Sequence, residues 1–487
     1  MALPGLTLPG LAQPRTNPSL PINAAAASSS RPARRETLEA RSEWRFEVGF
    51  NQRYHIKLES GSAELFGVEL APRQTLTFSG YKGAIFTWQG CQLELSGDAE
   101  SEYAGQETDY AIEWINVHGM LETLRSQEPV QAPRVLVVGP DFVGKTSLTR
   151  SLVAWSVRSG CCPIVINVDP REGLLCPPSA LTAVAIDSQM DVETGFGIGP
   201  VSGPTSSPVR TPLLYQYPFA SPYERPEVYK AIITRMALSV MNRLEEDGSV
   251  KKSGLFIDTP GTLNDPKSNY DLLYHIVSEF SINMILTIGS ERLSSDLTKR
   301  FQNAKSGEDA VTVLRISKPG GAIERDNAFM KHLRAQQVRH YFFGSGKEAL
   351  NPHSHSVPFA DLDIFRAQSQ SSVSSEESFG PDMGDDDDDY EASDATAPTA
   401  KSTNRNGLER ITPSLAMTGN LIAIKFCHGQ SEEREVRDSA VIGFLYVAEV
   451  DEVRKRVRFL APHPQRWGDK ALVWGQGWPE VISDLVL

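Results

Sequence analysis

The chain has 487 residues, 40% of them hydrophobic, and its 48 Lys and Arg against 61 Asp and Glu give a net charge of −13 at pH 7. This length allows about three domains with real cores, and the charge argues against a protein that binds nucleic acid over its whole surface, while a local basic site stays open. There is no run of about 18 apolar residues, no secretory signal pattern and no C-x-x-C among the five cysteines, so we expect a reduced intracellular protein without a membrane span or structural zinc.

Residues 1–36 are rich in Pro, Ala and Ser and end in an Arg cluster, which predicts a disordered tail. The cluster could be a localisation signal, but a solvated tail is the favoured interpretation. Residues 37–128 contain short alternating runs such as EWRFEV and YHIKLE, separated by Gly, Pro, Asn and Ser. This pattern predicts an antiparallel N-terminal β-sandwich or barrel. A helix at about 115–126 should link it to the next domain.

The next domain, residues 129–345, begins with a phosphate-binding signature. Residues 134–138 form an apolar strand, Gly139 to Thr146 read G-x-x-x-x-G-K-T, and a helical pattern starts at Thr146. The glycines let the loop turn its backbone N–H groups toward a phosphate, and the helix N-terminus adds partial positive charge. Lys145 can then reach the terminal phosphates, and the Thr146 hydroxyl can bind Mg²⁺. Nucleotide binding is therefore predicted from the residues alone.

The rest of this domain alternates between strands and helices. Apolar strands are expected at 163–169, 254–258, 282–288 and 311–316, with helices at 227–246 and 269–280. This order predicts a P-loop NTPase-type α/β domain with a parallel sheet, whose ligands sit at the carboxyl ends of the strands. The Pro-, Gly- and Ser-rich stretch 196–222 is expected to be a mobile loop.

Two aspartates end predicted strands of this sheet. Asp169 can hold Mg²⁺ or act as base toward an attacking hydroxyl, although a turn residue before a proline is the alternative. Asp258 opens a D-T-P-G segment like the γ-phosphate sensor of GTPases, so a GTPase switch is a rival interpretation. The N/T-K-x-D that guanine-selective GTPases carry is absent, and the nearest segment, S-K-P-G at 317–320, lacks the Asp. Residues 319–321, followed by Arg325, could form a lid that brings an arginine to the phosphates.

Residues 346–487 are predicted to form a small C-terminal β-rich domain, interrupted at 365–408 by a disordered acidic insertion. Five consecutive Asp at 385–389 carry much of the acidity, since their removal alone changes the net charge from −13 to −8. A solvated spacer is favoured over a mimic of nucleic acid. In VRKRVRFL, a strand would place Arg454, Arg456 and Arg458 on one face, with Val453, Val457 and Phe459 among its apolar members. An exposed sheet face is the favoured interpretation, and an RNA-backbone contact is the alternative.

These residues together resemble a known family. Stretches including SEWRFEV, GYKGAIFTW, GPDFVGKTSL, PIVINVDP, SGLFIDTP, PGGAIER and RHYFFGS are similar to the polynucleotide 5′-hydroxyl kinase family, and within it to the fungal Clp subunits of the mRNA cleavage and polyadenylation factor. The resemblance implies an N-terminal β domain that closes over the adenine of ATP. From the residues alone, Glu43 and Lys82 would be ordinary exposed strand and turn positions. The resemblance implies nucleotide contacts from Glu43, Lys82, Phe142, Val143, Gly144, Lys145, Thr146 and Ser147, and Mg²⁺ at Thr146 and Asp169.

The sequence departs from the active kinases of that family at three places. The RNA-holding T-x-G-W clasp reads T-P-G-T at 259–262, the D-x-G-Q segment reads D-P-R-E at 169–172, and the second lid arginine is replaced by Met330. Stacking on the missing Trp is worth about 1–3 kcal/mol per base. The pattern resembles the fungal members, which hold ATP without kinase activity.

The resemblance implies an ATP-binding structural subunit of the nuclear pre-mRNA 3′-end cleavage and polyadenylation complex, cleavage factor IA, required for endonucleolytic cleavage. Its implied partner is the factor that recognises the RNA polymerase II C-terminal tail. The rival interpretations are an ATP-dependent RNA 5′-hydroxyl kinase and, less favoured, a GTPase switch.

Overall fold

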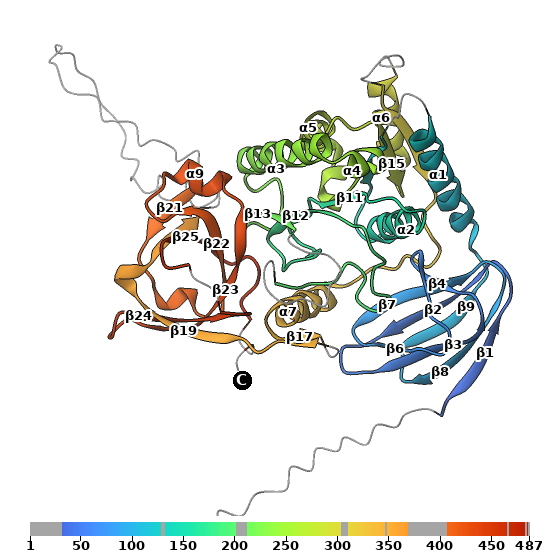
Figure 1. Cartoon of the computed structure of the whole chain (residues 1–487), viewed down its shortest axis with the longest axis horizontal. Helices are drawn as coiled ribbons and strands as arrows, with labels where there is room; N and C mark the ends of the chain where they lie inside the picture. Colours follow the sequence, from blue (N-terminus) through green and yellow to red (C-terminus); the bar gives the residue numbers. More distant parts are fainter. Residues whose placement is uncertain are drawn as a thin grey trace, which may run out of the picture.

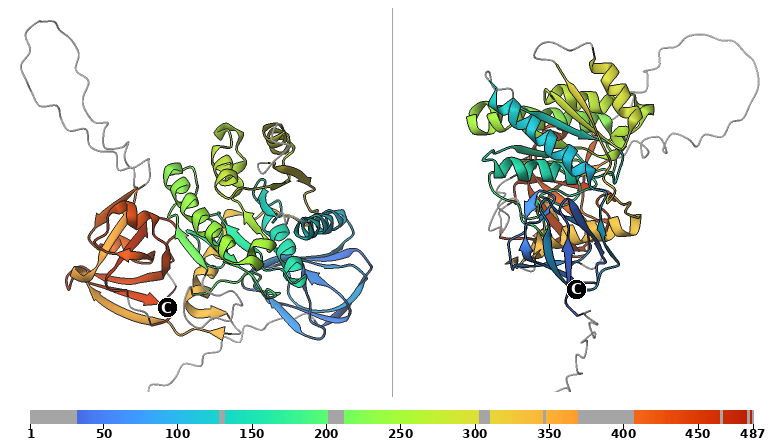
Figure 2. Two further views of the ribbon diagram at one scale, coloured as in Figure 1. Left: turned by 45° about the horizontal axis from the view of Figure 1, so that its top comes forward. Right: turned by 90° about the vertical axis from the view of Figure 1, so that its right-hand side faces the viewer.

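A computed structural model of the chain describes residues 32–127, 132–200, 212–302, 310–345, 348–368, 407–464, 467–482 and 485. It contains an N-terminal β-sandwich, a central α/β region around the P-loop strand and a C-terminal β-rich region, as predicted (Figure 1). The two β regions lie on opposite sides of the central region (Figure 2). Within the described ranges, no helix is both long and apolar enough to cross a bilayer.

The N-terminal region consists of two antiparallel sheets with strand orders β1-β8-β3-β6 and β5-β4-β7-β2-β9. Burial alternates along β3, where Tyr54, Ile56 and Leu58 point into the core and their neighbours are half-buried, as the period of two in a strand requires. The strands are β1 (Arg34–Leu38), β2 (Ser42–Val48), β3 (Tyr54–Gly61), β4 (Glu64–Leu65), β5 (Val68–Glu69), β6 (Thr75–Phe78), β7 (Tyr81–Thr87), β8 (Cys91–Gly97) and β9 (Ser101–Gly105).

The predicted tail 1–36 overlaps the first strand. Residues 1–31 lie outside the described part of the chain, but β1 covers 34–36 and pairs with β8. Arg34 forms a 2.7 Å ion pair with Glu102, and its guanidinium lies 5.6 Å from the centroid of the Trp44 ring. Composition alone missed this strand because these partners are distant in sequence.

The central region is built on a seven-stranded sheet of order β13-β12-β11-β14-β10-β15-β16. Its elements are α1 (Asp109–Ser126), β10 (Arg134–Val138), α2 (Lys145–Arg158), β11 (Ile164–Asn167), β12 (Ala180–Ala185), β13 (Leu213–Gln216), α3 (Pro226–Glu246), α4 (Gly248–Ser253), β14 (Leu255–Asp258), η1 (Gly261–Asn264), η2 (Pro266–Ser268), α5 (Asp271–Glu279), β15 (Met284–Ile288), α6 (Glu291–Phe301), β16 (Thr312–Ile316) and α7 (Asn327–Phe343).

The prediction of a parallel sheet is correct for the five strands from β11 to β16 and wrong at one edge. β12 and β13 run antiparallel to their neighbours, so the sheet is mixed. β13 also lies within 196–222, the predicted mobile loop, of which residues 201–211 are outside the described ranges. Leu214 and Tyr215 of β13 are buried, and the strand contacts β23 of the C-terminal region. Local composition could not report this long-range packing.

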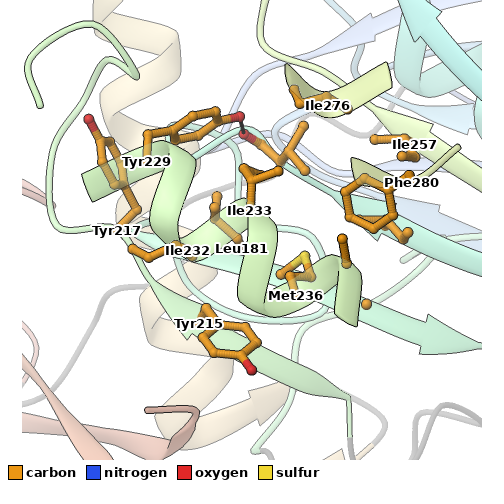
Figure 3. Close-up of a cluster of buried hydrophobic side chains, with 14 of the residues drawn as sticks. Leu181, Tyr215, Tyr217, Tyr229, Ile232, Ile233, Met236, Ile257, Ile276 and Phe280 are labelled. Atoms are coloured by element: carbon orange, nitrogen blue, oxygen red, sulfur yellow. Dashed lines mark hydrogen bonds between the residues drawn. The ribbon is translucent and has the colours of Figure 1, made fainter. Parts of the chain in front are cut away.

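The P-loop strand β10 is covered on both faces. Val135 and Val137 enter a core with α1 and α2, whereas Leu136 and Val138 enter a core with α3 and α5. Figure 3 shows the second core, where the Tyr229 hydroxyl donates a 2.8 Å hydrogen bond to the Val168 carbonyl. Cover on both faces explains the uninterrupted apolar run of this strand.

The C-terminal region has a seven-stranded sheet of order β19-β24-β23-β22-β25-β20-β21, in which β20 and β25 are parallel and the other pairs antiparallel. The elements are β17 (Gly344–Ser345), β18 (Glu348–Ala349), β19 (His353–Pro358), η3 (Phe359–Asp361), β20 (Asp363–Ala367), β21 (Leu408–Ile411), η4 (Leu415–Met417), β22 (Leu421–His428), α9 (Glu433–Asp438), β23 (Val441–Asp451), β24 (Arg456–Ala461) and β25 (Lys470–Gly475).

Two expectations for this region need correction. The limits predicted for the acidic insertion, 365–408, enter β20 and β21, which pair because Phe365 and Leu408 are buried; residues 369–406 lie outside the described ranges. The predicted basic strand is shorter than expected. Val453 is 93% exposed and precedes β24 in a turn with Arg454, so only Arg456 and Arg458 alternate with buried strand residues.

A buried carboxylate joins the sandwich to the P-loop helix. Glu64 of β4 is 5% exposed, and its oxygens accept hydrogen bonds of 3.2 Å each from the indole N–H groups of Trp155 on α2 and of Trp88. Burial raises the pKa of Glu64, and the two indole donors oppose that rise. Nearby, Gly67 has φ +79° and its Cβ position lies 2.8 Å from the Ser151 carbonyl, so only glycine permits this close approach.

We expect Trp155→Phe to lower the free energy of unfolding, because it deprives the buried Glu64 carboxylate of a donor, a loss worth about 1–3 kcal/mol. Urea denaturation measures the change. Trp474→Phe is the matched control, since Trp474 is also buried but its indole N–H has no hydrogen-bond partner among the described residues. Equal costs for the two substitutions would contradict a role for the hydrogen bond.

Candidate functional site

The predicted phosphate-binding loop follows β10 directly. Gly139 has φ +152°, and a Cβ there would lie 2.2 Å from the Ile288 carbonyl. Gly144 has φ +96° and immediately precedes α2. Both positions require glycine. The loop therefore curls around its own backbone N–H groups at the N-terminus of α2, which is the arrangement of an anion site.

The side chains expected to bind phosphate and Mg²⁺ lie at the start of α2. Lys145 is 8% exposed, and its Nζ donates a 2.7 Å hydrogen bond to the Pro140 carbonyl, so the ammonium group folds back over the loop. The Thr146 hydroxyl donates a 2.5 Å hydrogen bond to Oδ2 of Asp258. The other carboxylate oxygen, Oδ1, is buried and has no hydrogen-bond partner among the described residues.

A cavity of about 310 Å³ lies between this loop and the sandwich. Its volume falls in the range of small-molecule sites, roughly 300–1,000 Å³. Of the predicted loop residues, Val143 does not line the cavity. Its side chain is 5% exposed and packs in the hydrophobic core, which leaves only its backbone to face a ligand. The loop residues that line the cavity are Phe142, Gly144, Lys145, Thr146 and Ser147.

Glu43 and Lys82 reach the cavity from the paired strands β2 and β7. The residues alone suggested exposed positions, which is wrong for both: Glu43 is fully buried, and the Lys82 side chain, in strand β7, is only 17% exposed. Its carboxylate accepts hydrogen bonds from Arg45 Nε and from the Tyr110 hydroxyl. Lys82 Nζ forms a 2.8 Å ion pair with Glu47. Glu43 is thus held rigidly and Lys82 is held by Glu47 at the cavity, a placement that only the family resemblance indicated.

The segment predicted to be a lid borders the same cavity. Pro319, Gly321 and Arg325 line it, and the Arg325 guanidinium lies 5.9 Å from the centroid of the Phe329 ring. Met330, which stands where a second lid arginine was expected, is 7% exposed and apolar. One lid arginine therefore faces the cavity, and the second position contributes packing but no charge.

Asp169 lies at the end of the cavity near the loop, two residues after β11. Its Oδ1 accepts a 2.8 Å hydrogen bond from the backbone N–H of Arg171 and lies 3.7 Å from Arg171 Nε. The same guanidinium donates a 2.7 Å hydrogen bond to Oδ1 of Asp141 in the P-loop. Asp141 Oδ1 also accepts a 3.0 Å hydrogen bond from the Gly261 N–H. The P-loop and the two strand-end segments are thereby joined.

Burial raises the pKa of Asp169 to about 7 and that of Asp258 to about 6. For Asp169 the neighbouring Glu172 adds to the rise, while Arg171 and Lys145 oppose it. For Asp258 the opposing influences are Lys145 and the Thr146 hydroxyl. Both carboxyls therefore titrate near neutral pH, the range in which an acid or base is effective.

The structure places a further carboxylate beside Thr146, one of the two expected Mg²⁺ ligands. Sequence reasoning paired Thr146 with Asp169, but the carboxylate in contact with Thr146 is that of Asp258. The described ranges hold no group of three or more His, Cys, Asp or Glu side chains suited to a metal ion. Mg²⁺ often keeps several waters and takes oxygens from nucleotide phosphates. Thr146 and the unpartnered Asp258 oxygen fit such an ion.

Sequence reasoning also missed Arg150, which lines the cavity and ties the two domains together. Its NH1 donates a 3.1 Å hydrogen bond to the Tyr81 hydroxyl of the sandwich, and its NH2 donates a 2.9 Å hydrogen bond to the Val192 carbonyl. Arg150 lies four residues after Thr146, so the two side chains share a helix face. That spacing was a usable signal.

Three family models match successive parts of the chain. The N-terminal β-sandwich domain of polyadenylation factor matches residues 37–128. The P-loop of the mRNA cleavage and polyadenylation factor CLP1 matches 139–344, and the pre-mRNA cleavage complex II protein Clp1 matches 350–480.

Similar proteins and structures span the chain. It is 41% identical to the mRNA cleavage and polyadenylation factor clp1 of Botryotinia fuckeliana, over 92% of this chain and 94% of that protein. It is also 41% identical to the factor CLP1 of Phaeosphaeria nodorum, over 100% of both. The structure resembles wild-type Clp1p in complex with Pcf11p (454–563), with a TM-score of 0.79, 25% identity and coverage of 91% and 97% of the two chains. A second structure, of the extended interface between Pcf11p and Clp1p and of ATP loss in a glycine-to-arginine mutant, matches with a TM-score of 0.77 and 25% identity, over 91% and 98% of the chains.

We expect the free energy of unfolding of the nucleotide-free protein to fall as the pH rises from about 5 to about 8. Asp169 and Asp258 have folded-state pKa values of about 7 and about 6, above the ordinary aspartate value, so the folded state binds protons more tightly than the unfolded chain. Their stabilising contribution is complete below about pH 4 and is lost as the pH rises through the folded pKa values. Urea denaturation across this range measures the slope.

Asp258→Asn should flatten this pH dependence, because the amide cannot titrate. The control is Asp271→Asn, which alters an exposed carboxyl on α5 that pairs with Lys230. If the slope of the Asp258→Asn protein equals that of the control, the buried Asp258 carboxyl is not responsible.

Proposed function

The chain belongs to the Clp1 family of mRNA cleavage and polyadenylation factors, and from this premise we propose that it is an ATP-holding structural subunit of the nuclear pre-mRNA 3′-end processing machinery. The observation that carries the proposal is the cavity with walls from two domains. Lys145 and Thr146 face it from the central region, and Glu43 and Lys82 face it from the sandwich. A ligand between them contacts both domains at once.

ATP in this cavity would act as a clasp between the sandwich and the central region. The triphosphate fits the backbone N–H groups of the loop and Lys145, with Mg²⁺ at Thr146 and Asp258, while the base lies toward Glu43 and Lys82. A ligand that binds only the folded, closed arrangement stabilises it by about 2.7 kcal/mol at a concentration of 100 times its Kd. ATP then serves as a structural element of the fold.

The partner proposal rests on the solved relatives. Clp1p is bound to Pcf11p in both matching structures, and ATP is lost in a point mutant of one of them. We propose that this chain assembles in the same way with the subunit that recognises the RNA polymerase II C-terminal tail, within a nuclear cleavage factor IA required for endonucleolytic cleavage. ATP would keep the domains in the arrangement that this partner binds.

An RNA 5′-hydroxyl kinase remains the second candidate because of one observation. The pKa of Asp169 is raised to about 7, the value expected for a general base near neutral pH. Against it stand the missing clasp Trp, the apolar Met330 in the lid and the ion pair of Asp169 with Arg171. These features support retention of ATP in preference to transfer of its γ-phosphate to RNA.

We expect the purified full-length chain to carry bound ATP that survives prolonged incubation, with no label transferred from γ-labelled ATP to a 5′-hydroxyl RNA oligonucleotide. Denaturation followed by anion-exchange chromatography identifies the bound nucleotide. Lys145→Ala should weaken the affinity for ATP by roughly tenfold or more, because charge-assisted hydrogen bonds contribute about 1.5–3 kcal/mol. Lys230→Ala, which alters a half-buried lysine of α3 outside the cavity lining, is the control.

The other outcomes are specific. Label transfer that depends on Asp169 would establish the kinase instead. Bound GTP would establish the GTPase switch. A chain that binds no nucleotide would contradict the proposal that ATP joins the two domains.

A further inference from the structure

One arginine joins the three segments that surround the γ-phosphate end of the cavity. Arg171 binds Asp141 of the P-loop at 2.7 Å and lies 3.7 Å from Asp169, while Asp141 also accepts the Gly261 N–H that follows β14. Asp141 and Asp169 line the cavity, and Arg171 lies outside its lining. The guanidinium therefore sits on the rim, across the gap between the two carboxylates.

The backbone around Arg171 is fixed from outside the site. The Trp478 indole N–H and the Ser179 N–H donate to the Pro170 carbonyl at 3.2 and 2.9 Å. The Gln337 side-chain amide donates to the Gly173 carbonyl at 3.1 Å, and the Asn167 side-chain amide donates to the Glu172 carbonyl at 2.9 Å. These bonds come from the C-terminal region, β11, the segment before β12 and α7, the helix that follows the lid segment and is called the lid helix below. Because its loop is held on both sides, Arg171 cannot leave the rim by a loop motion without breaking several of them.

Local charge favours this position of the guanidinium. Four carboxylates line this part of the cavity, from Asp141, Asp169, Glu172 and Asp258, whereas Lys145 is the one lysine of the loop. The Arg171 side chain is 29% exposed and the Asp169 side chain is 10% exposed, so their interaction is only partly screened by water. Arg171 thus balances negative charge beside Asp169 and Asp141.

We propose that Arg171 closes the acceptor side of the nucleotide site and so keeps the bound ATP from reacting. The proposal rests on the proposed function, since it assumes ATP in the cavity. In the blocked step, a hydroxyl or water oxygen would bond to the γ-phosphorus, the bond from the γ-phosphorus to the β–γ bridging oxygen would break, the proton would pass to Asp169, and ADP would leave. Arg171 lies 3.7 Å from Oδ1 of Asp169 and so engages the oxygen that would take the proton. It acts as a positioning residue, through Asp141 and Asp169.

The test uses the full-length chain loaded with γ-labelled Mg–ATP, with ADP formation followed in a single turnover, with and without a 5′-hydroxyl RNA oligonucleotide. Arg171→Ala should raise the rate of ADP formation by roughly 10²-fold, the lower end of a general-base contribution. Adding Asp169→Asn to Arg171→Ala should abolish the gain. Arg171→Lys should show a smaller rise, because lysine keeps the charge without the planar fork. Arg243→Ala, which removes an exposed guanidinium paired with Asp247 on α3, is the control.

A second variant keeps the test informative if the Arg171→Ala protein fails to fold or does not bind ATP. Asp141→Asn keeps an oxygen for the Gly261 N–H but weakens the ion pair that holds the guanidinium, so it should also raise ADP formation, by less. ATP occupancy and thermal stability are recorded for every variant. A purely structural role would lower both without turnover in either variant, and that result would overturn the proposal.

The outcomes also separate this inference from the function on which it rests. If the wild-type, Arg171→Ala and Asp141→Asn proteins all form no ADP while ATP stays bound, only the role of Arg171 is overturned. If wild-type protein itself turns ATP over as fast as Arg171→Ala, both the role of Arg171 and the structural use of ATP fail. A gain that survives Asp169→Asn would also overturn the role assigned here, because another base would then be responsible.

Discussion

The register of β10 against β14 is the constraint on which the site depends. Val137 lies opposite Asp258 in this parallel pair, and the hydroxyl of Thr259 donates a 2.7 Å hydrogen bond to the Val137 carbonyl. β11 flanks β14 on its other side, with Asn167 opposite the same Asp258. Because parallel strands end at the same edge, the P-loop, Asp169 and Asp258 emerge together. A shift by one residue would turn Asp258 away from the Thr146 hydroxyl.

The sandwich completes this edge only because it is docked at several independent points. Glu64 receives the Trp155 indole, Arg150 binds the Tyr81 hydroxyl, and Gly67 permits close packing on α2. All three contacts fall on the helix that begins at the P-loop. The helix α2 therefore sets the orientation of the sandwich and also positions the phosphate-binding residues. A ligand that spans the cavity is coupled to both the sandwich and the central region.

The sequence predicted the parts of the fold and site that local chemistry determines. The glycines of the loop, Lys145, Thr146 and the existence of the five parallel strands follow from spacing and apolar periodicity. What escaped prediction depends on distant partners. β13 contacts the C-terminal region, Glu43 accepts a hydrogen bond from the distant Tyr110, and Asp258 contacts Thr146 only because two strands are adjacent in the sheet. Such adjacency is a property of topology, which composition and periodicity do not encode.

Holding a nucleotide and turning it over place different demands on the same sheet edge. Holding requires the backbone cradle, Lys145 and the second domain, all of which the chain has. Turnover additionally requires that an acceptor reach the γ-phosphate with Asp169 free to take its proton. Here that carboxyl has a pKa of about 7, suited to the task, but Arg171 pairs with it from a loop that is held by bonds from Trp478 and Gln337. Because Trp478 belongs to the C-terminal region and Gln337 to the lid helix, the state of the acceptor side is linked to how those two elements pack. On the role proposed for Arg171, the difference between retention and reaction therefore lies outside the P-loop itself.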